Sequence, residues 1–159
     1  MNKWDKNYLK LAEHISGWSK DPSTKVGCVV VSNSGQILAT GYNGFPRGVE
    51  DSEERLNERK MKYQMVVHAE MNAIYNATYH GISLRGSKMY VWGLSCCSEC
   101  AKGIIQAGVH RVIAVSTKEA SRWAAANNLA IQMLEEGNVY YEIWDKDFNC
   151  RTRVCGEGS

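Results

Sequence analysis

Residues 88–116 read KMYVWGLSCCSECAKGIIQAGVHRVIAVS, and this stretch decides the fold. It begins with a β-rich run at 88–93 and continues with a helical pattern at 98–107, which stops before Gly108. Glycine is typical just after the last turn of a helix. A second β-rich run follows at 110–116. A strand, a helix and a strand in this order predict a βαβ unit with two parallel strands.

Upstream of this unit, the sequence predicts a helix, a hairpin and a second helix. Apolar residues near the N-terminus recur three and four positions apart, as on one helical face: Trp4, Tyr8, Leu11, Ile15 and Trp18. Asp21-Pro22 is expected to end this helix, because proline disfavours helical backbone in the residue before it. Two β-rich runs at 25–32 and 36–42 flank the turn Asn33-Ser34-Gly35 and predict an antiparallel hairpin. A helix is then expected over 69–78.

Downstream of the unit, a helix is predicted over 118–136 and a strand over 139–144, while the polar residues 146–159 are expected to form a frayed tail. The highly charged residues 50–62 are expected to form a solvated loop or a short helix. Helices that alternate with strands indicate an α/β fold. The element order predicts a three-layer α-β-α sandwich with a five-stranded mixed sheet, formed by a single domain over 1–145.

Composition and charge exclude several classes of protein. The 159 residues carry 19 basic and 17 acidic side chains, a formal net charge of +2, so no long-range field would attract a nucleic-acid backbone. No run of about eighteen apolar residues is present, which argues against a membrane span. The first residues, MNKWDKNYLK, lack the apolar core of a signal peptide. We therefore expect a cytoplasmic protein with neither a nucleic-acid polymer nor a membrane as partner.

The six cysteines are unevenly distributed. Cys96, Cys97 and Cys100 crowd one short segment, and in a reducing compartment such crowding favours metal binding over disulfides. Cys28 lies in an apolar run and is expected to be a small buried residue. Cys150 and Cys155 lie in the polar tail, and the sequence indicates no role for them.

The chemistry is concentrated in His68-Ala69-Glu70 and Cys97-Ser98-Glu99-Cys100. One imidazole and two thiolates are three good zinc ligands, and three protein ligands leave the fourth tetrahedral position open for water, as in catalytic zinc sites. All three predicted ligands, His68, Cys97 and Cys100, lie near helix starts, where the helix dipole favours thiolates. Glu70 is two residues from the histidine and can carry protons without binding the metal.

Other interpretations of these motifs stay open at this point. A lone CxxC could be half of a structural zinc knuckle, but a second ligand pair is missing at the expected distance. A histidine at a helix start is often structural. Glu99 is most simply a first-turn carboxylate favoured by the helix dipole. Cys96 could be a spare ligand, although the tight turn should let only one of Cys96 and Cys97 reach the metal.

An H-x-E motif followed by P-C-x-x-C is the established signature of zinc deaminases. The chain resembles the zinc-dependent cytidine/deoxycytidylate deaminase superfamily over most of its length, most strongly over 19–116. GYNGFPRG at 41–48 and HAEMNAI at 68–74 narrow the resemblance to the deoxycytidylate branch. SKDPSTKVG at 19–27 and CSECAKGIIQAGV at 97–109 add to it. Cys96 stands where the family pattern has proline, and the segment 44–67 lacks the extra Cys/His cluster of a second, structural zinc.

The resemblance implies a cytidine deaminase-like fold and hydrolytic deamination of dCMP to dUMP and ammonia, with one catalytic Zn²⁺. Zinc-activated water would attack C4 of the cytosine ring, and Glu70 would protonate N3 and later the departing amine. Asn43 matches the residue that bonds the sugar, and the loop at 116–118 is expected to help close the pocket. The resemblance also implies that Ala69 and Ser95 contact the base and that Ser23 and Lys25 lie near the 5′-phosphate.

The resemblance also implies a homohexamer that dCTP activates and dTTP inhibits, with Mg²⁺ carried by the triphosphate. Tyr42, Asn43 and Gly44 are the residues expected near this effector. Three rival functions remain. A tRNA adenosine deaminase would need a basic surface, and a free cytosine or cytidine deaminase would need no phosphate pocket. A non-catalytic zinc-stabilised binding module would have no use for a carboxylate at Glu70.

Overall fold

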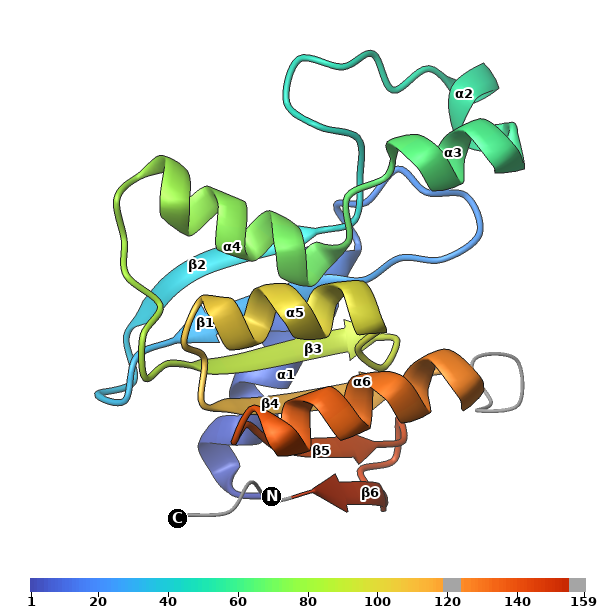
Figure 1. Cartoon of the computed structure of the whole chain (residues 1–159). Coiled ribbons are helices and arrows are strands. Elements are labelled where there is room, and N and C mark those ends of the chain that lie inside the picture. The colour runs from blue at the N-terminus through green and yellow to red at the C-terminus, as the bar shows by residue number, and fades with distance from the viewer. Residues whose placement is uncertain (119–123, 155–159) are drawn as a thin grey trace.

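A six-stranded mixed sheet runs through the centre of the computed structural model, which describes residues 1–118 and 124–154 (Figure 1). Its strands lie in the order β2 (Ile37–Tyr42), β1 (Gly27–Val31), β3 (Lys88–Gly93), β4 (Arg111–Ser116), β5 (Tyr140–Trp144) and β6 (Cys150–Val154). The strands β3, β4 and β5 are mutually parallel, and the other neighbours pair antiparallel. The predicted α/β fold, the hairpin and the βαβ unit are therefore confirmed.

Helices cover both faces of the sheet, which gives three layers (Figure 1). On one face lies α1 (Lys3–Ser16), and on the other lie α4 (Ala69–Tyr79), α5 (Ser98–Gln106) and α6 (Ala124–Glu136). Successive strand residues point to opposite faces. Val29 and Val31 accordingly pack in the core under α1, while Cys28 and Val30 pack in the larger core under α4, α5 and α6.

The first helix buries a different face from the one its aromatic residues predict. Its buried residues are Asp5, Leu9, Ala12, Ile15 and Ser16. Of the predicted face, Ile15 is buried, and Tyr8 and Leu11 pack partly buried against the core, but Trp4 and Trp18 are 63% and 54% exposed. The buried stripe is therefore shifted by about one residue from the predicted one. The helix also ends at Ser16, well before Asp21-Pro22.

The prediction of five strands is wrong, because the described part of the chain contains a sixth strand. β6 pairs antiparallel with β5. A tight turn joins them: the Asp145 carboxylate accepts hydrogen bonds from the N–H groups of Asp147 and Asn149, and Phe148 has a left-handed φ of 61°. The Arg153 Nε lies 3.1 Å from a carboxylate oxygen of the buried Glu142 on β5. Residues 150–154 thus belong to the sheet rather than to a frayed tail.

Two further predicted segments are refined. The charged residues 50–62 contribute to two short helices, α2 (Glu53–Asn57) and α3 (Arg59–Met65), and Lys62 is buried rather than solvated. Of the helix predicted over 118–136, Ala124–Glu136 is helical and Lys118 is not. Residues 119–123 lie outside the described residues, as does Cys155. No helix within 1–118 and 124–154 is long and apolar enough to cross a membrane.

Candidate active site

Two helix starts and the carboxyl end of β3 meet at one place. His68 is the N-cap residue of α4, and Cys97 is the N-cap residue of α5. Neither side chain caps its own helix, so both are free to face a ligand. The chain reaches Cys97 directly from the carboxyl end of β3, the edge of a parallel sheet where α/β proteins bind ligands.

Close packing against β2 fixes the start of α4. A Cβ atom at Gly41 would lie 2.4 Å from the Ala69 carbonyl oxygen, so only glycine lets the helix approach this closely. The Asn72 side-chain NH₂ donates to the Tyr42 carbonyl at 2.7 Å, which ties the helix to the outer edge of the sheet. These contacts hold His68 and Glu70 in place from the far side of the helix.

The structure brings the three predicted metal ligands together. His68 Nδ1 lies 3.3 Å from Cys97 Sγ and 3.4 Å from Cys100 Sγ, and all three ligand atoms lie within 4.8 Å of one another. A tetrahedral zinc ion with ordinary bond lengths places a nitrogen and a sulfur ligand about 3.6 Å apart. The donor atoms and their spacing therefore fit Zn²⁺.

Cys96 is separate from this group. It is buried, its Sγ contacts the Cys97 carbonyl oxygen at 3.3 Å, and its backbone N–H donates to the Tyr141 hydroxyl at 2.8 Å. Within the described residues, the cluster of possible ligand atoms contains Cys97 and Cys100 but not Cys96. The expectation that only one of the adjacent cysteines faces the metal thus agrees with the geometry.

Hydrogen bonds within the ligand cluster shift the pKa values of all three side chains. The hydrogen bond from Cys100, followed by that from His68, lowers the pKa of Cys97 to about 4 despite burial. The hydrogen bond with Cys97 raises the pKa of His68 to about 9. The hydrogen bond with Cys97 and burial raise the pKa of Cys100. One thiolate is therefore present at neutral pH, and metal binding has to displace the remaining protons.

Glu70 lies beside the ligands without joining them. It is in the first turn of α4, is only 4% exposed, and lines the same pocket as His68. Burial raises the pKa of the Glu70 carboxyl, and the nearby His68 charge offsets this only in part. A buried carboxyl with a raised pKa next to a metal cluster is suited to accept and return protons.

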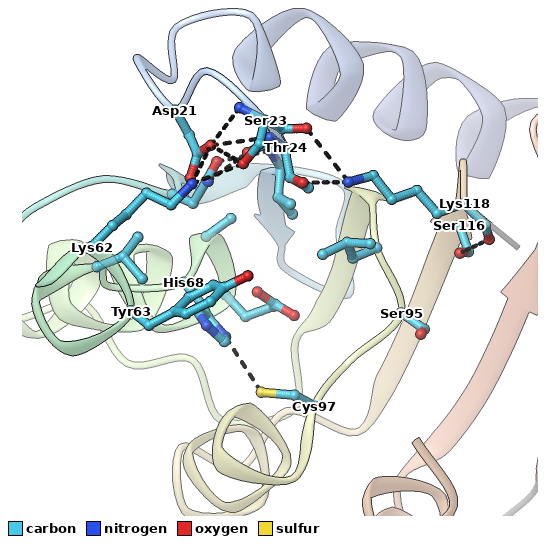
Figure 2. A pocket seen from close by; sticks show the side chains of 16 residues that line it. Asp21, Ser23, Thr24, Lys62, Tyr63, His68, Ser95, Cys97, Ser116 and Lys118 are labelled. Atoms are coloured by element: carbon cyan, nitrogen blue, oxygen red, sulfur yellow. Dashed lines mark hydrogen bonds and ion pairs between the residues drawn. The ribbon is translucent and has the colours of Figure 1, made fainter. Parts of the chain in front are cut away.

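A pocket of about 220 Å³ extends from the ligand cluster toward the loop before β1 (Figure 2). It is lined by Asp21, Ser23, Thr24, Val26, Asn43, Lys62, Tyr63, Val66, His68, Ala69, Glu70, Leu94, Ser95, Cys97, Ser116 and Lys118. Of the predicted substrate contacts, the structure thus brings together Asn43, Ala69, Ser95 and Ser23. Lys25 is exposed and is not part of the lining.

The predicted effector residues lie apart from this lining, except Asn43. Tyr42 is exposed at the edge of the sheet, and Gly44 pairs with Val67. Asn43 is buried, and its side chain accepts from the Val26 N–H and donates to the Thr24 carbonyl, both at 2.8 Å. Asn43 therefore holds the segment that forms one wall of the pocket.

A buried ion pair in the pocket wall escaped prediction. Lys62 and Asp21 are each 7% exposed, and Lys62 Nζ lies 3.2 Å from Asp21 Oδ1 and 2.8 Å from Ser23 Oγ. The same Asp21 oxygen accepts hydrogen bonds from the N–H groups of Ser23 and Thr24 at 2.8 and 3.0 Å. Lys62 lies in a run of charges, so no sequence pattern distinguishes it from its solvated neighbours.

Replacing Asp21 by asparagine is expected to lower the free energy of unfolding by about 3 kcal/mol at pH 7, because Lys62 would stay buried without its counter-charge. Burial raises the pKa of the Asp21 carboxyl, but hydrogen bonds from Ser23, Thr24 and Lys62 outweigh it and lower the pKa overall. The stabilisation that ionised Asp21 contributes is therefore complete above the ordinary aspartate pKa of about 4. It is lost as the pH falls through the lower pKa that Asp21 has in the folded state. Urea unfolding of both proteins should give a constant difference from about pH 7 to 5 and a smaller one near pH 3. A difference that does not shrink in acid would contradict this assignment.

Comparison with known proteins agrees with this geometry. The family model of the cytidine and deoxycytidylate deaminase zinc-binding region matches residues 2–116. The chain is 37% identical over 141 residues to an uncharacterized deaminase in the luxG 3′ region of Aliivibrio fischeri, a match that covers 87% of this chain and 92% of the relative. It is 40% identical over 121 residues to the deoxycytidylate deaminase of Homo sapiens. That match covers 73% of this chain and 66% of the human one.

The fold matches a solved enzyme of the same kind. The dCMP deaminase from the cyanophage S-TIM5, solved in complex with dCMP and dUMP, has a TM-score of 0.71 and 32% identity, over 90% of this chain and 98% of that one. The family match spans more than half of the chain and includes every predicted metal ligand. The chain therefore belongs to the cytidine and deoxycytidylate deaminase family.

Proposed function

We propose that this protein converts dCMP and water to dUMP and ammonia, as a deoxycytidylate deaminase of pyrimidine deoxynucleotide metabolism that supplies dUMP for thymidylate synthesis. One observation carries the proposal: a single pocket is lined at one end by Glu70 and by His68 and Cys97 of the ligand cluster, and at the other by Lys62 and Lys118. The ligand cluster with Glu70 is suited to deaminate a base, and the wall with the lysines is suited to bind an anionic group on the same substrate. The likeness to the cyanophage enzyme in complex with dCMP and dUMP supports this choice.

His68, Cys97 and Cys100 would hold a zinc ion, which supplies Lewis-acid activation of water when bound. Glu70 would take one proton from the attacking water and pass it to N3 of the cytosine ring. It would then take the remaining proton of the new C4 hydroxyl group and pass it to the amine, so that ammonia leaves as the C4 carbonyl forms. Its position in the first turn of α4, beside the ligands but outside their cluster, is what this shuttle requires. Burial of Glu70 limits exchange of the proton with bulk water.

The pocket walls orient the substrate in this proposal. Ala69, Ser95 and Asn43 all line the pocket. We expect Ala69 and Ser95 to face the base edge and Asn43 to lie beside the sugar. The Asn43 amide already uses one donor and one acceptor on the Thr24–Val26 backbone, which leaves one N–H for a hydroxyl group of the substrate. Ser23 lines the pocket and would contact a 5′-phosphate, while Lys25 lies outside the lining.

Regulation and assembly are also part of the proposal. We expect a cytoplasmic homohexamer, activated by dCTP and inhibited by dTTP with Mg²⁺ on the triphosphate, and an effector near Tyr42, Asn43 and Gly44. The exposure of Tyr42 supports its access to a ligand from outside the pocket. The chain is a single deaminase domain, and the pairing of β6 supports placing its end at or beyond Val154 rather than at residue 145.

The proposal is tested by ammonia release from dCMP, dCTP, deoxycytidine and cytidine, each with and without added dCTP or dTTP, on the zinc-loaded protein. We expect dCMP to be the preferred substrate and its rate to respond to both effectors. Equal kcat/KM values for deoxycytidine and dCMP would contradict the nucleotide assignment. Activity on tRNA adenosine alone would favour the tRNA-editing rival, and zinc binding without any turnover would favour a structural module.

A further inference from the structure

The two lysines that line the pocket differ in how their charge is balanced. Lys62 is buried against the Asp21 carboxylate, so its charge is compensated within the protein. Among the described residues, the Lys118 ammonium hydrogen-bonds to neutral acceptors only, the Ser23 carbonyl oxygen at 3.4 Å and the Thr24 hydroxyl. Over residues 1–118 and 124–154, Lys118 forms no ion pair with a carboxylate. Of the two, Lys118 therefore carries the charge that is available to a ligand.

The surroundings of Lys118 suit an anion. An ammonium group has three N–H donors, and the described contacts of Lys118 use two of them. Asp21, Lys62 and Lys118 together carry one excess positive charge at this end of the pocket. Figure 2 shows Lys118, Ser23 and Thr24 gathered across the pocket from His68 and Cys97. An anionic group attached to a base bound at the metal cluster would therefore meet Lys118.

We propose that Lys118 is the residue that makes this pocket select a 5′-phosphorylated nucleoside over the free nucleoside. The Asp21–Lys62 pair acts as a positioning element, because the Asp21 carboxylate gathers the backbone of Ser23 and Thr24, against which the Lys118 ammonium rests. This inference rests on the proposed function and replaces Lys25 by Lys118 as the main phosphate contact. Lysine is a common phosphate partner, acting as a point charge.

The test compares kcat/KM for dCMP and for deoxycytidine in five proteins: wild type, Lys118→Gln, Lys118→Arg, Lys25→Gln and Lys10→Gln. Lys118→Gln should lower the dCMP-to-deoxycytidine ratio about 10- to 100-fold, through a higher KM for dCMP, because a charged hydrogen bond to the ground state is lost. Lys118→Arg should retain most of the ratio. The matched control Lys10→Gln, an exposed lysine on α1, should leave it unchanged.

The binding of inorganic phosphate tests the role of Lys118 directly, because phosphate affinity would not depend on Lys118 if this residue were only structural. In the wild type it should compete with dCMP but not with deoxycytidine, since phosphate and the nucleoside would occupy different parts of the pocket. Calorimetry should also show phosphate binding to the zinc-loaded wild type and at least about tenfold weaker binding to Lys118→Gln.

Several outcomes would overturn the inference. They are an unchanged substrate ratio in Lys118→Gln, an equal loss on both substrates, and a collapse of the ratio in Lys25→Gln alone. Failure of the proposed function looks different, because the wild type itself would then release no ammonia from either substrate. In that case the calorimetric comparison still decides whether Lys118 binds phosphate.

Discussion

Replacing Glu70 by glutamine is expected to reduce kcat for dCMP by about 10³- to 10⁴-fold and to leave the zinc content and the fold unchanged. General acid–base catalysis by one positioned group contributes about 10²- to 10⁴-fold, and the upper part of this range applies because Glu70 serves more than one proton transfer. Glutamine has nearly the same shape and cannot shuttle a proton. Elemental analysis and circular dichroism check the metal and the fold, and the ammonia assay measures the rate.

The chain offers a close control for this variant in Glu99. Like Glu70, Glu99 is two residues from a predicted ligand and lies in the first turn of a helix. Its side chain is exposed and pairs with Lys102 at 2.7 Å, so it should take no part in proton transfer. Glu99→Gln should keep nearly full activity. If Glu70→Gln stayed active, or if both variants lost activity equally, Glu70 would not be the proton carrier.

The ligand cluster could be predicted because each half of it is a local motif. His68 and Glu70 share the start of one helix, and Cys97 and Cys100 share the start of another. The βαβ pattern around the second motif then indicates a sheet whose carboxyl edge gathers helix starts. Little long-range information was needed, since spacing within each motif and the topology together determine the site.

The buried face of α1 could not be predicted in the same way. Periodicity favours the aromatic residues, yet Asp5 is buried because the Tyr90 hydroxyl donates to it at 2.9 Å and Arg111 lies 3.4 Å away. Tyr90 is 85 residues further along the chain, so only the folded sheet provides this partner. A large amphipathic ring such as that of Trp4 can stay partly exposed at the edge of the core, at a lower free-energy cost than an exposed aliphatic core residue would have.

The same limit explains the two other misses. Lys62 is buried only because α3 brings it to Asp21, and an isolated lysine in a charged run is normally solvated. The strand β6 carries polar residues, so its apolar signal is weak, and it forms because β5 offers a free edge and the turn at Asp145 reverses the chain. Contacts with residues distant in the sequence determine both the burial of Lys62 and the formation of β6, and residue spacing alone does not indicate such contacts.

Replacing Cys100 by serine is expected to abolish zinc binding and to reduce dCMP deamination by on the order of 10³-fold or more, because Lewis-acid activation of water depends on the metal. Cys100 is fully buried, and its Sγ lies 3.4 Å from His68 Nδ1, within the ligand cluster. A serine hydroxyl at this position would be a much poorer zinc ligand than a cysteine thiolate. Elemental analysis should find about one zinc per chain in the wild type and almost none in the variant. A chelator should lower the melting temperature of the wild type only, since a bound metal stabilises the folded state by mass action.

Cys96→Ala is the matched control, because Cys96 is also buried, is next to a ligand, and lies outside the ligand cluster. Its Sγ hydrogen-bonds to the Cys97 carbonyl oxygen and packs in the apolar core, and its backbone bond to Tyr141 does not depend on the side chain. The variant should keep its zinc and most of its activity, with a stability loss of about 1 kcal/mol from the deleted buried sulfur. Zinc lost from Cys96→Ala but retained by Cys100→Ser would mean that a different pair of thiols holds the metal. Retention of zinc by both variants would contradict the assignment of Cys100 as one of three required protein ligands.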